Sequence, residues 1–424
     1  MGQIILKQKR KRRLESGHPW IYRNEIEEVR GEPEPGAMVM VKNHQGHELA
    51  VGLWHPTSQI AVRIISYDAS ERVDRHWLKR KVVQAWSYRK RFLSNTDACR
   101  VVYGEADGIP GLIVDKYSSV AVIQITSLAM DIRRDWIAPV LQDVLGVTAI
   151  YERSDAPTRL LEGLEPIEQC LFGDCPAEVE IQENGIYYHV DIKDGQKTGH
   201  FFDQRENRAA IAPVVRFGAK EKPRPDQRFR EEQADIIQAT SVQSTRIGAQ
   251  VLDCFSHTGA FALNAIRYGA QQVTLVDSSE RAMEQAQKNA ARNGFSDRCE
   301  FVVGNAFDLL REYERDRRQF DVVILDPPAF AKNRAAVESA LRGYKEINLR
   351  GLKLVREGGF LVTASCSSHV APEEWREVIV EAALDARKVL RLVEYRSAAK
   401  DHPQLVGMAE NDYLKFAIFE VRPR

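Results

Sequence analysis

Two apolar runs that end abruptly in polar or reactive side chains constrain the fold of this sequence most strongly. Residues 320–325 read Phe-Asp-Val-Val-Ile-Leu and precede Asp326-Pro327-Pro328, and residues 359–364 precede Ser365-Cys366-Ser367. Short apolar runs of this length are typical of buried strands. In an open α/β sheet the ligand crevice lies at the carboxyl ends of the strands. The pattern therefore predicts that Asp326 and Cys366 lie side by side at a reactive edge.

Length and charge limit the classes of protein that fit. With 424 residues, the chain is long enough for two or three domains. The 60 Lys and Arg residues balance the 60 Asp and Glu residues, so affinity for a polyanion has to come from local patches.

Cysteine spacing and hydropathy indicate in which cellular compartment, and in which redox state, the protein is expected. The six cysteines lack a regular spacing, the sequence does not open on a signal peptide, and no run of about 18 apolar residues occurs. We therefore expect a reduced, soluble, cytoplasmic protein without a membrane partner. Cys170 and Cys175 resemble half of a zinc site, but no second Cys or His pair with zinc spacing follows, so we expect no metal.

The first 72 residues predict a small β-barrel with a basic opening. Short β-like runs at 38–41, 48–53 and 60–65 are separated by turn residues. Six Lys and Arg residues fall between Lys7 and Arg13, and the aromatic residues Trp20 and Tyr22 follow. Cations neutralise phosphates and rings stack on bases, so this segment suits a polynucleotide. A solvated basic strand with Trp20 in the core is the alternative.

Residues 73–190 predict an α+β connector domain. Apolar residues at helical spacing over 73–93 indicate a helix whose aromatic side chains pack in a core. Strands are expected at 99–103, 112–115, 120–125 and 149–152, with a second helix at 132–145. No catalytic constellation occurs here, which favours a scaffold.

From about residue 191 to the end, strands and helices alternate, as in a doubly wound, Rossmann-like parallel sheet. A strand at 250–254 leads through the loop 255–259 into a helix at 260–268, and a second strand, at 272–277, ends in Asp277. An acid at that position binds ribose hydroxyls in nucleotide-binding folds, although it can also simply cap a helix. The loop has one glycine, Gly259, and lacks the G-x-G-x-x-G and Walker patterns for phosphates. A ligand with a ribose and no phosphates fits, and S-adenosylmethionine is such a ligand.

Two further loops complete the predicted site. The strand at 300–303 is followed by Asn305 and Asp308, which can contact an adenine edge or cap the next helix. Pro327 and Pro328 fix φ at two successive positions and hold their loop rigid beside Asp326.

Taken in order, these motifs resemble one enzyme family over nearly the whole chain. The segments 17–22 and 199–208, the loop after Asp253, and Asp277, Asn305, Asp326-Pro327-Pro328 and Ser365-Cys366-Ser367 are similar to those of S-adenosylmethionine-dependent class I methyltransferases with an N-terminal PUA domain. That family forms 5-methylcytosine in large-subunit (23S) ribosomal RNA. The resemblance implies a PUA-like RNA-binding domain at 1–72, the connector at 73–190 and a methyltransferase domain at 191–424. It implies ribosomal RNA as partner and leaves a homodimer open.

The resemblance also implies roles for individual residues. Cys366 and Asp326 would face the target base, and the cofactor would contact Asp203, Arg205, Phe255, Ser256, Gly259, Asp277, Ser278, Asn305, Ala306 and Asp326. A thiolate is needed because carbon 5 of cytosine is a poor nucleophile until sulfur adds to carbon 6.

Several alternatives stay open at this level. A cysteine at a strand end can be a small packing residue, which is how we interpret Cys254. His257 and His369 adjoin the predicted site and are ordinary loop residues or proton carriers. An Asp-Pro-Pro loop followed by an aromatic residue, here Phe330, also suits methylation of an exocyclic base nitrogen. An inactive RNA-binding assembly factor on the same scaffold is a third hypothesis. The charged, proline-rich residues 220–233 predict an inserted loop.

Overall fold

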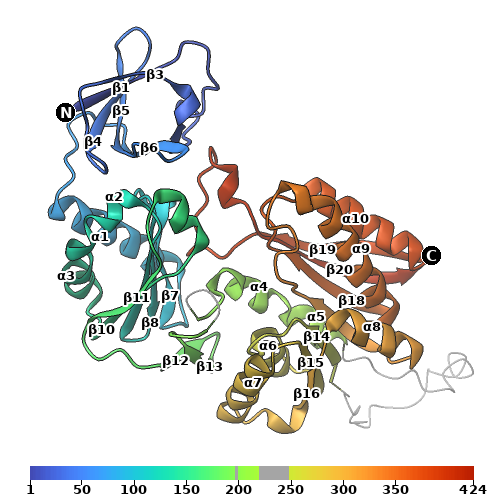
Figure 1. Cartoon of the computed structure of the whole chain (residues 1–424). Helices are drawn as coiled ribbons and strands as arrows, with labels where there is room; N and C mark the ends of the chain where they lie inside the picture. The colour runs from blue at the N-terminus through green and yellow to red at the C-terminus, as the bar shows by residue number, and fades with distance from the viewer. Residues whose placement is uncertain (196–198, 219–247) are drawn as a thin grey trace, which may run out of the picture. The chain divides into compact units, whose positions relative to one another are not determined.

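The computed structural model describes residues 1–195, 199–218 and 248–424 (Figure 1). The chain forms two compact units. The first comprises Met1–Arg205 and Ala398–Asp412, and the second comprises Glu206–Ser397 and Tyr413–Arg424. The expected inserted loop at 220–233 lies outside the described residues.

The first unit begins with a curled six-stranded sheet in the order β2-β6-β5-β4-β1-β3 (Figure 1). Its interior is apolar, with Ile4, Val39 and Val62 completely buried. The expected runs at 38–41, 48–53 and 60–65 correspond to three of its strands, whereas the first three strands are too short or too polar to stand out. The bounds are β1 (Gly2–Leu6), β2 (Trp20–Tyr22), β3 (Ile26–Arg30), β4 (Met38–Lys42), β5 (Glu48–Trp54) and β6 (Ile60–Ser66).

A five-stranded sheet in the order β11-β10-β9-β8-β7 follows. Helix α1 begins after Asp74, whose side chain accepts a hydrogen bond from the Trp77 backbone N–H and so caps it. Trp77 is fully buried against strand residues such as Val114 and packs in the core as predicted. The prediction is wrong for Phe92, which ends the helix and is 47% exposed. The bounds are α1 (Arg75–Phe92), β7 (Ala98–Tyr103), β8 (Leu112–Tyr117), β9 (Val120–Ile125), α2 (Leu128–Asp131), α3 (Arg134–Leu145), β10 (Ala149–Ser154) and β11 (Ile167–Phe172), followed by a hairpin of β12 (Glu178–Glu183) and β13 (Ile186–Asp191).

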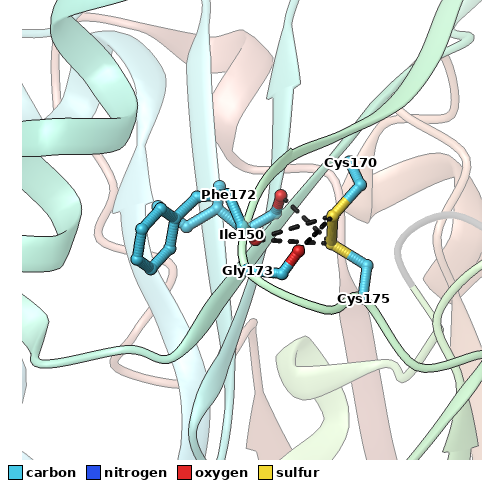
Figure 2. The surroundings of a disulfide bond; sticks show 5 residues. All are labelled: Ile150, Cys170, Phe172, Gly173 and Cys175. Atoms are coloured by element: carbon cyan, nitrogen blue, oxygen red, sulfur yellow. Dashed lines mark hydrogen bonds between the residues drawn. A yellow bond between two sulfur atoms is a disulfide. The ribbon is translucent and has the colours of Figure 1, made fainter.

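The expectation that all cysteines are reduced is wrong for one pair. Cys170 and Cys175 form a disulfide bond (Figure 2). Cys170 lies on β11, and Gly173 turns the chain back in the left-handed region, at φ 71°. This turn brings the two Cα atoms to 6.0 Å, a usual separation for a disulfide. While the disulfide is intact, the two sulfur atoms are not available as thiolate ligands for zinc.

A buried ionic network stabilises the first unit near its boundary. The guanidinium of Arg205 donates to Glu183 (3.1 Å), to Asp401 (2.7 Å) and to the backbone carbonyl of Ala98 (2.8 Å). Burial by itself would raise the pKa of Asp401, but Arg205 and His402 outweigh burial and lower that pKa, so the carboxylate stays ionised. The network joins strands to the segment 398–412, which is distant in sequence.

The second unit is built on a seven-stranded sheet in the order β16-β15-β14-β17-β18-β20-β19. Neighbouring strands from β16 to β18 are parallel, and β20 is antiparallel to both β18 and β19. The strand order reverses between β14 and β17, which is where doubly wound sheets open a ligand crevice. The bounds are β14 (Gln250–Cys254), β15 (Gln272–Asp277), β16 (Cys299–Val303), β17 (Phe320–Leu325), β18 (Val355–Ser365), β19 (Lys388–Arg396) and β20 (Lys415–Pro423).

Helices cover both faces of this sheet. Val322 and Ile324 of β17 pack in one hydrophobic cluster with α5, α6 and α7, whereas Val323 and Leu325 pack in another with α8, α9 and α10. This alternation is the period of two expected for a strand buried on both faces. The bounds are α4 (Arg205–Ala210), α5 (Ala212–Gly218), α6 (Ala260–Arg267), α7 (Glu280–Arg292), α8 (Ala306–Arg315), α9 (Val337–Leu354) and α10 (Pro372–Asp385). Among the described residues, no helix combines the length and apolarity needed to cross a bilayer.

The Arg205 network generates a stability prediction. Replacing Arg205 with Met leaves the carboxylates of Glu183 and Asp401 buried without its charge, so the free energy of unfolding should fall by about 3–5 kcal/mol. Urea unfolding, with hydrogen exchange followed in peptides of the first unit, measures this loss. Arg342→Met, which removes the exposed ion pair with Glu338, is the control and should cost less than about 0.5 kcal/mol. Equal effects of the two substitutions would contradict the structural role of Arg205.

Candidate functional site

The candidate site of the second unit lies where β17 and β18 end side by side. The two strands pair in parallel, with Leu325 opposite Thr363. Asp326 follows directly after β17, and Cys366 follows directly after β18. The side-by-side placement predicted from the two apolar runs is therefore what the strand pairing produces.

Cys366 is partly exposed, and its sulfur lies beside the Asp-Pro-Pro loop. The distance from Cys366 Sγ to the backbone oxygen of Pro327 is 3.8 Å. The following residue, Ser367, is completely buried, and its Oγ hydrogen-bonds to the hydroxyl of Tyr344 at 2.8 Å and accepts from the backbone N–H of Ala331 at 3.2 Å. These bonds attach the turn after β18 to α9 and to the segment after β17, so the position of Cys366 is well fixed.

The loop after β14 has an unusual backbone. Phe255 and His257 adopt positive φ values of 63° and 48°, which cost energy for residues with a side chain. The carboxylate of Asp277 accepts hydrogen bonds from the backbone N–H groups of His257 (2.8 Å) and Ser279 (2.9 Å) and so holds the loop against the end of β15. Backbone strain sustained by such contacts is frequent at ligand-binding sites.

Gly259 ends this loop at φ 82°. A Cβ atom there would lie 3.2 Å from Leu275 and 3.3 Å from Ala286, closer than ordinary contacts. The single glycine noticed in the sequence is therefore required by the backbone and by the close packing of the loop on β15 and α7.

Asp253 lies at the end of β14 and is fully buried. Its Oδ2 accepts a hydrogen bond from the backbone N–H of Ala262 at 3.0 Å. Burial, and then the carboxylates of Asp326 and Asp277, raise the pKa of Asp253 well above its usual range, which favours the protonated form. Asp253 Oδ1 and the Oγ of Ser256 are both buried without a hydrogen-bond partner among the described residues. A polar ligand in the crevice would satisfy such atoms.

Four aromatic residues form a continuous cluster near the loop. Phe255 lies 6.4 Å, between ring centroids, from both Phe307 and Phe330, and Phe330 lies 4.7 Å from Tyr344. Phe255, Phe307 and Phe330 are each partly exposed, so they offer apolar surface suited to a planar ring. Phe330, which follows the Asp-Pro-Pro loop, therefore packs in this cluster through its contacts with Phe255 and Tyr344.

The remaining expected cofactor residues of the second unit lie at the ends of β15 and β16. Ser278 is exposed and follows Asp277 directly. Asn305 is exposed and caps α8 by accepting a hydrogen bond from the backbone N–H of Phe307 at 2.9 Å, while Ala306 is buried at the start of that helix. A cap orients an amide at the crevice edge, so capping and ligand contact are compatible for Asn305.

Asp203 and Arg205 lie in the first unit, in the part of the chain that precedes the boundary. Asp203 is buried, and its backbone oxygen accepts a hydrogen bond from Ala399 at 2.8 Å. Cofactor contacts by these two residues stay a prediction, and the bonds of Arg205 already give that residue a structural role.

The basic segment of the first unit divides into tethered and exposed cations. Arg10 forms an ion pair with Glu15 at 2.6 Å, and Arg13 lies 4.9 Å above the ring of Tyr22. Trp20 is only partly buried, and its indole N–H donates to Glu105 at 2.8 Å, so the core placement considered for it is wrong. Lys7 is exposed, but its Nζ donates to the backbone oxygen of Asn24 at 2.9 Å. Lys9, Lys11 and Arg12 are also exposed.

Sequence reasoning missed three residues that the structure places around Cys366 or the loop. Phe307 and Tyr344 are in helices, where an aromatic residue is normally a core residue, and Lys415 is a buried lysine in the last strand. The signal available in the sequence was the lysine itself, because a charge inside the apolar run 414–419 is costly unless it is paired. Within the described ranges, no group of His, Cys, Asp and Glu residues is arranged to hold a metal ion.

The free thiols should differ in reactivity. Cys254 is 1% exposed, and burial raises the pKa of its thiol well above the usual range, whereas Cys366 is partly exposed. Iodoacetamide at pH 7.5 should alkylate Cys366 at least about tenfold faster than Cys254 in the folded protein. Peptide mass spectrometry measures both rates, with the buried Cys99, whose pKa burial raises to about 12, as an internal control. Comparable rates for Cys254 and Cys366 would refute this difference.

Known protein families and solved structures resemble this chain in sequence and in fold. Residues 4–67 match the family described as PUA-like domain, and residues 215–380 match the family described as conserved hypothetical protein 95. Two solved structures share the fold over 99% of this chain and 100% of theirs: a putative SAM-dependent methyltransferase from Streptococcus mutans (TM-score 0.77, 19% identity) and a putative methyltransferase complexed with SAH (TM-score 0.79, 20% identity). The expected combination of a PUA-like barrel with a doubly wound methyltransferase fold is thereby confirmed.

Sequence relatives are closer. The chain is 36% identical over 423 residues to ribosomal RNA large subunit methyltransferase I of Alteromonas mediterranea and 37% identical over 424 residues to the protein of the same name from Shewanella frigidimarina. Both alignments cover 99% of this chain and 99% of the relative. The chain therefore belongs to the ribosomal RNA large subunit methyltransferase I family.

Proposed function

We propose that this protein methylates carbon 5 of a cytosine in large-subunit ribosomal RNA, with S-adenosylmethionine as methyl donor and Cys366 as nucleophile. The observation that carries the proposal is the partly exposed Cys366 sulfur, 3.8 Å from the backbone oxygen of Pro327 at the carboxyl edge of the sheet. A thiol whose role is packing would be expected in the hydrophobic interior, as Cys254 is.

The residues around the crevice suit S-adenosylmethionine. Asp277 ends the second strand of the nucleotide-binding half, where a carboxylate accepts hydrogen bonds from ribose hydroxyls. Phe255 and Phe307 offer surface for adenine, with Asn305 and Ala306 beside them, and Asp253 and Ser256 present buried oxygens to polar groups of a ligand. When bound, the ligand supplies an electrophilic methyl group on a sulfonium ion.

The reaction that we propose for the protein's own groups begins with the Cys366 thiolate. Its sulfur forms a bond to carbon 6 of the base, and the electron pair of the C5–C6 double bond makes carbon 5 nucleophilic. Carbon 5 then takes the methyl group as the sulfonium S–CH3 bond breaks, which leaves S-adenosylhomocysteine as the neutral thioether. Transfer of the carbon 5 proton to water restores the C5–C6 double bond, breaks the S–C6 bond and regenerates the thiolate.

Asp326 is the proposed partner of the base on its other edge. A carboxylate accepts a hydrogen bond from the exocyclic amine, or donates one to the ring nitrogen when protonated. Asp326 precedes two prolines that restrict its loop, so the group is held at a fixed place beside the thiol. This arrangement favours a flipped-out base, because stacking covers the ring face that the sulfur has to reach and pairing covers the edge that Asp326 would contact.

Cys366→Ala tests the nucleophile. Methylation of carbon 5 should fall by roughly 10⁴-fold or more because the covalent route is lost. The measurement is bisulfite sequencing of ribosomal RNA from a strain that carries only the variant, together with transfer of labelled methyl groups in vitro. Cys299→Ala, at a partly buried position on β16, is the matched control and should keep its activity. Undiminished methyl transfer by Cys366→Ala would instead support methylation of an exocyclic nitrogen, which needs no thiol.

The exposed cations of the first unit generate a prediction about RNA. Replacing Lys9, Lys11 and Arg12 with Gln should weaken RNA binding and reduce the slope of log affinity against log salt by about 2–3, since each phosphate contact contributes roughly 0.7–0.9. Affinity for S-adenosylmethionine should not change. Filter binding at several salt concentrations and calorimetry give the two values.

The matched control removes three exposed arginines elsewhere, Arg315, Arg317 and Arg391, by the same change to Gln. It should leave the salt slope within about one unit of the wild-type value. A control that reproduces the loss would show that net charge, rather than the basic segment, governs RNA affinity.

A further inference from the structure

A buried lysine holds the turn that carries Cys366. Lys415 opens β20, stands opposite Ser365 in the antiparallel pairing with β18, and is 1% exposed. Its Nζ donates to the backbone oxygens of Ser367 (2.7 Å), Val370 (2.9 Å) and Tyr413 (3.0 Å). Two of these three acceptors belong to the turn directly after Cys366.

The number of acceptors identifies the charge state of this lysine. A neutral amine has two N–H donors, and an ammonium has three. Three carbonyl oxygens at hydrogen-bond distance match the three donors of the ammonium, which places a positive charge next to the turn. Burying a charge is costly, and such a charge is usually retained where it interacts with another group.

We infer that Lys415 is a positioning residue for the Cys366 thiolate, and this inference rests on the nucleophilic role proposed above. Its ammonium fixes the backbone carbonyls at 367 and 370, while Tyr344 and Ala331 fix the side chain of Ser367. The turn is thus held from both sides, which fixes the backbone that carries Cys366, whose Sγ lies 3.8 Å from the backbone oxygen of Pro327. A buried positive charge nearby also favours a thiolate over a thiol.

The other polar groups around Cys366 do not take this role. Asp326 follows the neighbouring strand, and its negative charge disfavours a thiolate. Tyr344 is a neutral phenol, and burial raises its pKa, so it stays neutral. His369 is exposed to solvent, unlike Lys415. Lys415 is the buried cation that β20 packs against this turn.

The test compares a neutral and a charged substitution. In Lys415→Met, the pH at which Cys366 reaches half its maximal alkylation rate should rise by roughly one unit or more, because the nearby charge is lost. Methyl transfer at pH 7.5 should fall about tenfold or more with little change in the KM for RNA. Lys415→Arg keeps the charge and should return the alkylation profile most of the way to that of the wild type. Peptide mass spectrometry of the intact, folded protein gives the profiles.

Two controls separate this role from a loss of folding. Lys353→Met removes a partly exposed lysine that pairs with Glu314 on another helix, and it should leave the Cys366 profile unchanged. Binding of S-adenosylhomocysteine by each variant, measured by calorimetry, should stay within about threefold of the wild type. If Lys415→Met does not bind it, the comparison is made with Lys415→Gln, which keeps two donors without the charge.

The inference is overturned if the neutral variant and the wild type share one alkylation profile, or if Lys415→Arg reacts as the neutral variant does. Alkylation does not depend on methyl transfer. A wild-type protein that fails to methylate cytosine while Lys415→Met still shifts the profile would therefore reject the proposed function and keep the role of Lys415.

Discussion

The parallel pairing of β17 with β18 is the constraint on which the candidate site depends. Because the strands are adjacent and run in the same direction, the residues that follow them, Asp326 and Cys366, emerge at the same edge of the sheet. The β14 strand lies on the other side of β17 and brings the loop 255–259 to that edge. A carboxylate, a thiol and a strained loop thus meet, although about 110 residues of sequence separate the start of the loop, Phe255, from the thiol of Cys366.

Buried or partly buried charged residues hold the backbone of the loops at this edge of the sheet. Asp277 holds the backbone of the strained loop through two N–H groups, and Lys415 holds three carbonyls around the turn of Cys366. The two groups serve the same purpose with opposite charge: the carboxylate accepts from backbone N–H groups, and the ammonium donates to backbone carbonyl oxygens. Groups that are fixed in this way lose little orientational freedom when a substrate binds, which is a general condition for efficient catalysis.

In the first unit, charged residues have two separate roles, one in stability and one that we propose in RNA binding. Its ionic network around Arg205 is buried, so it contributes mainly by leaving no carboxylate unpaired, while its basic opening segment is exposed and acts through charge. Some of the cations in that segment are already engaged, as in the pairs of Arg10 with Glu15 and of Arg13 with Tyr22. Exposure, rather than the number of basic residues, therefore selects the candidates for phosphate contact.

The sequence by itself determined most of the strands that bear the site, since β14, β15 and β17 begin and end at the residues that their apolar runs indicate. It also indicated where β18 ends, but not that this strand begins at Val355, before the apolar run at 359–364. Local signals suffice there because the strands are buried on both faces and the loops begin at sharp polar residues. The sequence did not determine the disulfide between Cys170 and Cys175, the strands β19 and β20, or the roles of Tyr344 and Lys415. These depend on which distant segments become neighbours, and a lysine in an apolar run shows its function only once the carbonyls around it are known.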